Sequence, residues 1–391
     1  MNTGKIILNP GEEKRLLDGH PWVYNNEVNR LLGRIQSGDI VSVYSYQGDW
    51  IGQGFLNTQS KIFVRLLSRS EAPIDLDFFR RKLIIAKENR IQAGYQDTFR
   101  AFYAEADGIP GLIIDKYGEY IAVQFLSLGL DLRKQEIVSL IQEVYQPKGI
   151  YERSDSPIRE KEGLPSVSGN LFGTTPKWVV TNEGECRFLV DIQEGQKTGT
   201  FLDQTQNHLA IRPYCSHKRV LDCFSHAGHF AIQAAHAGAQ SVTAVDLSED
   251  ACQMIQKNQE ENAVDLTIVK RDVFDFLQTE IQQKATYDLI ILDPPAFTKT
   301  KNKLPQAKKG YKHINLQAMR LLTEGGILVS ASCSQHLLLT DFLEVIREAA
   351  AEAKKQVQLL ELKIQGSDHP ALLNLESSFY LKFLIMRVSS L

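Results

Sequence analysis

The sequence contains no run of about 18 apolar residues, which a membrane-spanning helix would need. Its first residues also lack the apolar core of a signal peptide. Cysteine is scarce: the chain has five, an odd number, scattered and without a CxxC pair. This pattern argues against a disulfide framework and against a zinc site. We therefore expect a cytoplasmic protein with reduced thiols, no membrane segment and no bound metal.

The sequence also lacks a large excess of either charge. It has 44 Lys and Arg and 47 Asp and Glu, which gives a formal net charge of −3. This balance gives no bulk electrostatic attraction to nucleic acid, so RNA binding would have to depend on local basic patches. No internal repeat or low-complexity tract is present. A length of 391 residues with 43% hydrophobic residues predicts a globular protein of two or three domains.

Residues 218–295 carry the most informative pattern. Four short apolar segments each end on an aspartate, and helical segments follow them. The acids are Asp222, Asp246, Asp272 and Asp293. Alternating strands and helices predict a parallel sheet with helices on both faces. Ligands of such sheets bind outside the carboxyl ends of the strands, where all four acids fall.

The spacing of these acids narrows the ligand. Asp246 lies 24 residues beyond Asp222, close to the ~20 expected for an acid that holds ribose hydroxyls. The turn after the first strand, 225–228, has one glycine where a dinucleotide fingerprint needs three, so it lacks a pyrophosphate cradle. A nucleoside without phosphates suits this turn better, and S-adenosylmethionine is the common one. The alternative is a generic doubly wound domain with acids at its strand ends.

Several segments resemble successive motifs of class I methyltransferases, and the whole chain resembles the bacterial large-subunit rRNA cytosine-C5 methyltransferase family, which carries an N-terminal PUA domain. The similarity rests on the catalytic segments DCFSHAGHFA, AVDLS, KRDVFDF, LDPPAF and VSASCS, and on GHPW (19–22), EADGIPGLIIDKYG (105–118), ERSD (152–155) and GQKTGTFLDQ (195–204). It implies an α/β fold with a Rossmann-like, seven-stranded, mostly parallel sheet. The expected domains are a small β-barrel PUA-like domain (1–72), an α+β middle domain that frames the RNA cleft (73–180) and the methyltransferase domain (181–391).

The expected cofactor is S-adenosylmethionine. We expect Asp246 to accept the ribose hydroxyls and Asp272 to face the adenine amino group. The resemblance implies that a segment before the sheet covers the methionine end. The full expected set is Asp222, Phe224, Ala227, Gly228, Asp246, Leu247, Asp272, Val273, Asp293, Lys197, Thr198, Phe201, Asp203 and Asn207.

Catalysis is expected from Cys333 and Asp293. Cytosine C5 is a poor nucleophile until a thiolate adds at C6, so a cysteine beside the base is required. Cys333 lies in a Ser-Cys-Ser segment that the resemblance marks as catalytic. The alternatives are that Cys333 is a small buried strand residue, that the Asp-Pro-Pro motif methylates a base nitrogen of guanine or adenine, or that the protein binds RNA without catalysis.

RNA contacts are expected from two basic segments. Residues 294–323 contain no Asp or Glu, and they carry Lys299, Lys301 and Lys303 beside the catalytic strand end. Arg153 and Arg159 lie in a polar loop of the middle segment. Either segment could instead be ordinary solvated surface. The implied partner is 23S ribosomal RNA. The modified nucleotide, free rRNA or an assembling subunit as substrate, and a homodimer all remain open.

Overall fold

The computed structural model describes residues 4–298 and 300–391. The chain divides into two units. The first comprises the residues up to Thr181 together with Val190–Asp203 and Ser367–Ser378. The second comprises Asn182–Leu189, Gln204–Gly366 and Phe379–Leu391. Among the described residues, no helix is both long enough and apolar enough to span a bilayer.

The first unit begins with a six-stranded sheet in the order β2-β6-β5-β4-β1-β3. Alternating residues of its strands, such as Val41 and Val43 of β4, are fully buried in one apolar cluster, as expected for strands with one face toward a core. The elements are β1 (Lys5–Leu8), α1 (Glu13–Leu17), β2 (Trp22–Tyr24), β3 (Val28–Leu32), β4 (Ile40–Tyr44), β5 (Trp50–Leu56) and β6 (Ile62–Ser68).

A five-stranded sheet in the order β11-β10-β9-β8-β7 follows in the same unit. Buried residues of α2 and α5 share one core with the strands of this sheet, so the expected α+β character of this segment is present. The elements are α2 (Leu76–Gln92), β7 (Thr98–Tyr103), α3 (Ala104–Asp107), β8 (Leu112–Tyr117), β9 (Tyr120–Phe125), α4 (Leu128–Asp131), α5 (Lys134–Tyr145), β10 (Gly149–Ser154) and β11 (Val167–Gly173). Strands β12 (Trp178–Glu183) and β13 (Cys186–Asp191) then pair with each other.

The second unit is built on a seven-stranded sheet in the order β16-β15-β14-β17-β18-β20-β19. The first five strands are parallel, and β20 runs antiparallel to both of its neighbours. This arrangement confirms the predicted seven-stranded, mostly parallel sheet. The strands are β14 (Arg219–Cys223), β15 (Ser241–Asp246), β16 (Thr267–Lys270), β17 (Tyr287–Leu292), β18 (Leu322–Ser332), β19 (Lys355–Lys363) and β20 (Lys382–Ser390).

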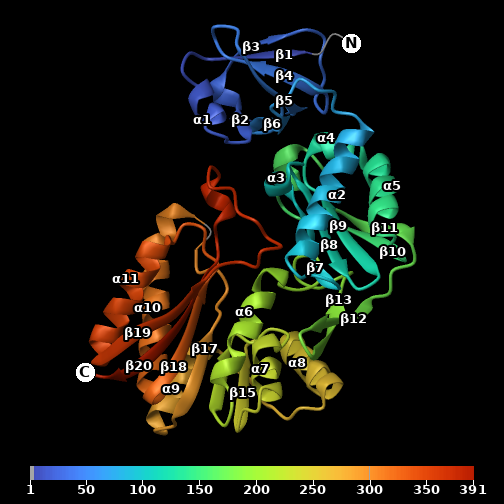
Figure 1. Cartoon of the computed structure of the whole chain (residues 1–391). Coiled ribbons are helices and arrows are strands. Elements are labelled where there is room, and N and C mark those ends of the chain that lie inside the picture. Colours follow the sequence, from blue (N-terminus) through green and yellow to red (C-terminus); the bar gives the residue numbers. More distant parts are fainter. Residues whose placement is uncertain (1–3, 299) are drawn as a thin grey trace. The chain divides into compact units, whose positions relative to one another are not determined.

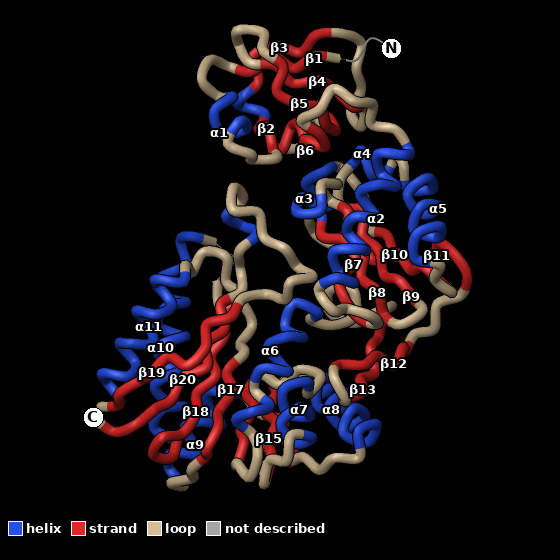
Figure 2. Tube along the Cα trace, in the orientation of Figure 1, coloured by secondary structure: helices blue, strands red, loops and turns tan. Residues whose placement is uncertain are grey.

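Helices cover both faces of this sheet (Figures 1 and 2). Helices α9, α10 and α11 pack on one face, and α7 and α8 pack on the other. Central strand residues such as Leu221, Ile290 and Leu328 are fully buried, which explains why these strands read as continuous apolar runs. The helices are α6 (Thr205–Ala210), α7 (His229–His236), α8 (Glu249–Asn262), α9 (Val273–Gln282), α10 (Leu304–Leu321) and α11 (Leu339–Ala353).

The strand order reverses between β14 and β17. From β14 the chain moves outward through β15 and β16, and it then returns to place β17 on the other side of β14. In open α/β sheets, ligands bind outside the carboxyl ends of the strands at this switch point. Asp222 on β14 and Asp293 just after β17 both lie there.

Candidate active site

The four predicted acids all lie at the carboxyl edge of the second unit's sheet. Asp222 is the penultimate residue of β14, and Asp246 is the last residue of β15. Asp272 caps α9 two residues after β16 ends, and Asp293 follows β17 directly. The parallel register sets Asp222 opposite Ala244 and Ile291. One edge of the sheet therefore carries four carboxyl groups.

The turn between β14 and α7 has an unusual backbone. Phe224, His226 and Gly228 have φ values of 62°, 50° and 81°, in the left-handed region that favours glycine. A Cβ at Gly228 would lie 3.1 Å from Cγ2 of Ile255, so space there is short as well. The His226 N–H donates to Oδ2 of Asp246 at 2.9 Å. Because strained residues persist only where surrounding contacts hold them, this turn has the character of a binding element.

Asp222 is a buried acid with unused hydrogen-bonding capacity. Its Oδ2 accepts the N–H of Ala231 at 3.2 Å, whereas its buried Oδ1 has no hydrogen-bond partner among the described residues. Burial, together with the smaller effect of the nearby Asp293 charge, raises the pKa of this carboxyl group to about 7. Oδ1 of the fully buried Asn207 in the same unit likewise has no partner within the described part of the chain. Buried polar atoms of this kind are expected to meet a ligand or water.

His229, in the turn's first helical position, is part of a ring stack. Its centroid lies 4.1 Å from that of Phe188 and 5.0 Å from that of His208. Burial lowers the pKa of His229 well below its usual value, so the ring is neutral. A hydrogen bond of 2.8 Å joins Nδ1 of His208 to Oε1 of Glu183. The neutral His229 ring therefore supports the turn by stacking, as a phenylalanine or tyrosine ring would.

The remaining acids combine turn-forming bonds with open acceptor positions. Asp246 accepts the N–H groups of His226 and Ser248, each at 2.9 Å. Asp272 uses Oδ1 to cap α9 through Phe274 and Asp275. A carboxylate has about four acceptor positions, so both acids can accept ligand hydroxyl or amino groups. Beside Asp246, the apolar Leu247 is 64% exposed.

The segment predicted to cover the methionine end is divided between the units. Lys197, Thr198, Phe201 and Asp203 belong to the first unit, and Asn207 to the second. Lys197 forms a 2.8 Å ion pair with Asp203 and lies 4.6 Å from the Phe201 ring centroid. Thr198 is fully buried, and its hydroxyl donates to Asp115. This hydroxyl therefore ties the segment to strand β8 of the first unit.

Cys333 lies just beyond the end of β18 and is partly exposed. Its neighbours Ser332 and Ser334 both form 3.0 Å hydrogen bonds with the hydroxyl of the buried Tyr311. Leu292 pairs with Ser330, so Asp293 and Cys333 follow the ends of two adjacent parallel strands, β17 and β18.

The basic segment after β17 is only partly available to a ligand. Lys299 lies outside the described residues. Lys301 and Lys303 are exposed on a short 3-10 turn, Lys301–Lys303. Lys308 pairs with Asp341 and Glu344 of α11, and Lys312 pairs with Glu348 and Glu352. The acid-free stretch of sequence is thus partly neutralised by the neighbouring helix.

The structure corrects the expectation for the two arginines. Arg159 is 1% exposed, and its guanidinium donates to Pro165, Phe125 and Asp131. Arg153 is 4% exposed and donates to backbone oxygens of Ile192 and Gly195. Because these donors are already used inside the protein, neither side chain is placed for a phosphate contact. Both stabilise the first unit instead.

Two polar residues near the candidate site, Gln204 and Lys382, were not predicted from the sequence. Gln204 donates to Oδ2 of Asp293 at 2.9 Å, and it ends the GQKTGTFLDQ segment, which could have drawn attention to it. Lys382 is buried beside the end of β18. Nothing near Lys382 in sequence marks it, because its proximity to Cys333 arises only from the pairing of β18 with β20.

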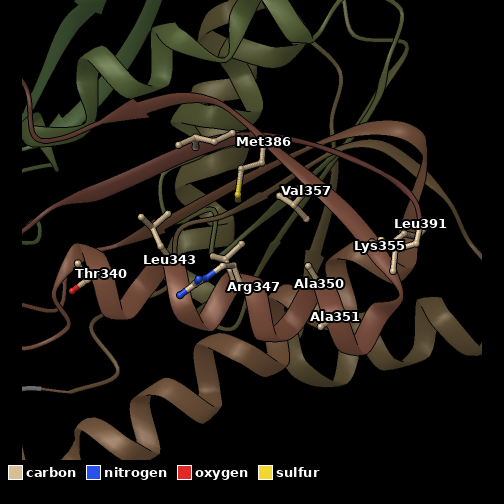
Figure 3. Close-up of a pocket in the computed structure, with 11 residues that line it drawn as sticks. Thr340, Leu343, Arg347, Ala350, Ala351, Lys355, Val357, Met386 and Leu391 are labelled. Atoms are coloured by element: carbon tan, nitrogen blue, oxygen red, sulfur yellow. The ribbon is translucent and has the colours of Figure 1, made fainter.

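An apolar cavity of about 680 Å³ lies between α11 and strands β19 and β20 (Figure 3). Leu343, Ala350, Val357 and Met386 line it, with Arg347 at its side. None of the predicted cofactor or catalytic residues lines this cavity. It therefore belongs to the helix-covered face of the sheet and not to the strand-end edge.

A model of the S-adenosylmethionine-dependent methyltransferase family matches residues 163–387, and a PUA-like domain model matches residues 6–69. The chain belongs to the S-adenosylmethionine-dependent methyltransferases. It is 40% identical over 390 residues to a protein named Ribosomal RNA large subunit methyltransferase I from Aeromonas salmonicida, with 98% of each chain covered.

Solved structures agree with this assignment. A SAM-dependent methyltransferase from Streptococcus mutans is 25% identical, with a TM-score of 0.82 and coverage of 98% of this chain and 99% of that one. A methyltransferase solved in complex with SAH is also 25% identical and has a TM-score of 0.84 over the same shares. The predicted fold and the S-adenosylmethionine cofactor are thereby confirmed. The oxygens of Asp222 and Asn207 that have no partner among the described residues fit a ligand with several N–H and O–H donors.

Replacing Asp246 by alanine should weaken S-adenosylhomocysteine binding by about ten- to a hundredfold, because a charge-assisted hydrogen bond is lost. Calorimetry of the full-length protein measures this change. Asp250→Ala, in the first turn of α8, is the control and should bind like the wild type. Unchanged affinity of Asp246→Ala would remove Asp246 from the site.

Asp222→Asn should change how the stability of the cofactor-free protein depends on pH. The folded state raises the Asp222 pKa from 3.8 to about 7, so between these values the folded protein holds a proton that the unfolded chain releases. Stability from this group therefore falls as pH rises, by about 1.4 kcal/mol per unit. Urea unfolding at pH 5 and pH 7 should show a smaller loss of stability in Asp222→Asn than in the wild type. Equal losses would contradict the burial of an ionisable Asp222.

Proposed function

We propose that this methyltransferase forms 5-methylcytosine in 23S ribosomal RNA through a covalent adduct of Cys333. The name of the Aeromonas salmonicida relative supports a large-subunit rRNA substrate, and the PUA-like domain supports RNA binding. The observation that carries the chemistry is the partly exposed Cys333 at the end of β18, next to the strand that leads into Asp293.

The second unit would hold the cofactor at the strand-end edge. Asp246 would accept the ribose hydroxyls, and Asp272 would accept the adenine amino group. Leu247 and Val273 would contact the adenine ring, while Asp222, Phe224, Ala227 and Gly228 form the turn beside the nucleoside. The parts predicted for Lys197, Phe201 and Asp203 stay predictions, as does the division into domains at residues 72 and 180.

The chain's own residues would act on the base as follows. The Cys333 thiolate adds to cytosine C6, and the electron pair of the C5–C6 double bond moves into the ring, making C5 nucleophilic. Asp293, held by Gln204, would orient the base or carry a proton near N3. When bound, S-adenosylmethionine supplies the electrophilic methyl group that C5 takes up. The methyl transfer would leave S-adenosylhomocysteine. Transfer of the C5 proton to a base then restores the C5–C6 double bond and expels the Cys333 thiolate.

The alternative is methylation of a base nitrogen through the Asp-Pro-Pro motif. Enzymes of that type use an aromatic residue after the motif to stack on the base, and here Ala296 follows, with Phe297 one place later. The Phe297 ring lies 4.6 Å from the Tyr311 ring, centroid to centroid. This packing supports a scaffold role for Phe297 and so favours the cytosine-C5 proposal.

Cys333→Ala should reduce methylation of rRNA by roughly 10³-fold or more, because no other group would replace the nucleophile. Transfer from tritiated S-adenosylmethionine measures the rate. RNA containing 5-fluorocytidine should trap an adduct with the wild type and none with Cys333→Ala. Cys252→Ala, which removes another partly exposed thiol, should methylate at the wild-type rate and should still form the adduct. Near-normal methylation by Cys333→Ala would reject the nucleophile and favour base-nitrogen chemistry.

Replacing Lys301 and Lys303 together by alanine should weaken RNA binding and reduce its salt dependence by about one slope unit for each lost phosphate contact. Filter binding at several salt concentrations measures the slope. The matched control is Lys308→Ala with Lys312→Ala, because these lysines of the same run already pair with α11 acids. Equal slopes in the two double variants would assign Lys301 and Lys303 to ordinary solvated surface.

A further inference from the structure

Lys382 is a buried cation next to the proposed nucleophile. It is the first residue of β20 and lies opposite Ser332 in the antiparallel pair of β18 and β20. Only 3% of Lys382 is exposed. Because Cys333 follows Ser332 directly, strand pairing brings this lysine and this cysteine to the same point of the sheet edge.

Two backbone carbonyls hold the Lys382 ammonium on either side of this point. Nζ donates to the oxygen of Ser334 at 2.7 Å and to the oxygen of Tyr380 at 2.8 Å. Within the described ranges, no carboxylate forms an ion pair with Lys382. An ammonium has three donors, so one remains after these two bonds. The bond to Ser334 directs the charge at the residue that follows Cys333.

Such a placement is unfavourable for the lysine unless a negative charge is close. Burial lowers the pKa of Lys382 to about 8, and the neighbouring Cys333 acts in the opposite direction. A buried charge without a partner destabilises a fold. An anionic sulfur at Cys333 would supply the partner, and by reciprocity the ammonium would favour that anion.

We propose that Lys382 is a positioning residue that keeps Cys333 in its thiolate form before RNA binds. The inference deepens the proposed function and rests on Cys333 being the nucleophile. A free thiol is mostly protonated at neutral pH and reacts poorly as a nucleophile. A fixed cation beside it raises the reactive fraction without itself touching the base.

The other groups around Cys333 do not supply this positive charge. Tyr311 of α10 is buried, which raises its pKa to about 12, so it stays neutral. Asp293, at the end of β17, is a carboxyl group and would oppose a thiolate. His336 lies in the exposed turn after Cys333. Lys382 on β20 is therefore the buried cation at this position among the described residues.

A structural role makes a different prediction. If Lys382 only ties the start of β20 to the end of β18, a neutral side chain that reaches the same carbonyls would replace it fully. Lys382→Gln retains N–H donors and removes the charge, whereas Lys382→Arg retains the charge. Lys355 is the matched control, because it pairs with Ser390 at the far end of β20.

The test is the alkylation rate of Cys333 by iodoacetamide between pH 5 and pH 9, in the full chain with Cys252→Ser, followed by peptide mass spectrometry. Neither RNA nor cofactor is needed. In Lys382→Gln and Lys382→Met, the alkylation rate should begin to rise only at a higher pH. At pH 7, alkylation should be slower by about tenfold. Lys382→Arg should retain most of the rate, and Lys355→Met should match the parent. The difference should shrink above pH 8, where the Lys382 ammonium loses its proton.

Folding is checked in each variant by S-adenosylhomocysteine affinity, and Lys382→Gln serves if Lys382→Met does not fold. A parental pH profile in a folded Lys382→Gln would overturn the inference and leave the lysine a structural tie. Failure of this inference can be distinguished from failure of the proposed function. A profile that depends on Lys382, together with full methylation by Cys333→Ala, would support the thiolate pairing and reject the nucleophile.

Discussion

The site depends on one topological constraint, the reversal of strand order beside β14. Because β14 and β17 are adjacent and parallel, their carboxyl ends emerge together while the chain leaves each strand in a different direction. The acids of four separate segments then share one edge of the sheet. Burial of the central strands β14, β17 and β18 on both faces supports this edge.

The same edge concentrates groups that a stable fold would otherwise avoid. Asp222 is buried with an unpartnered oxygen, His229 is buried and neutral, and Lys382 is a buried ammonium without an ion pair among the described residues. Burial of an unpartnered carboxyl oxygen or of an unpaired ammonium is unfavourable for a fold. Their concentration at the ends of β14 and β18 marks where charge is used for binding and chemistry. Buried charges of the first unit differ, since Arg90 and Arg100 pair with Asp107 and Asp115.

The sequence predicted the second unit well because its signals are local. Each strand-end acid directly follows its own apolar run, and the turn glycine lies between a strand and a helix, so pattern and spacing were sufficient. The sequence failed where partners are distant along the chain. Arg159 looked like a surface cation, and its bond to Phe125 depends on the fold of the first unit.

Pairing between separate elements explains the other differences. The acid-free run after β17 looked uniformly available to phosphates, yet the acids that neutralise Lys308 and Lys312 come from α11. Thr198 looked like a ligand contact, and Asp115 takes its hydroxyl. Lys382 had no sequence signal at all, because the register of β18 with β20 alone brings it to Cys333. Long-range pairing, rather than local propensity, decided each case.

The central claim is that this edge of the sheet transfers a methyl group to carbon 5 of a cytosine. The most direct measurement uses S-adenosylmethionine with a deuterated methyl group, 23S rRNA lacking the modification, and mass spectrometry of the digested nucleosides. The account predicts that the deuterated methyl group appears in 5-methylcytidine. Its appearance in an N-methylated guanosine or adenosine, with unlabelled cytidine, would contradict the account.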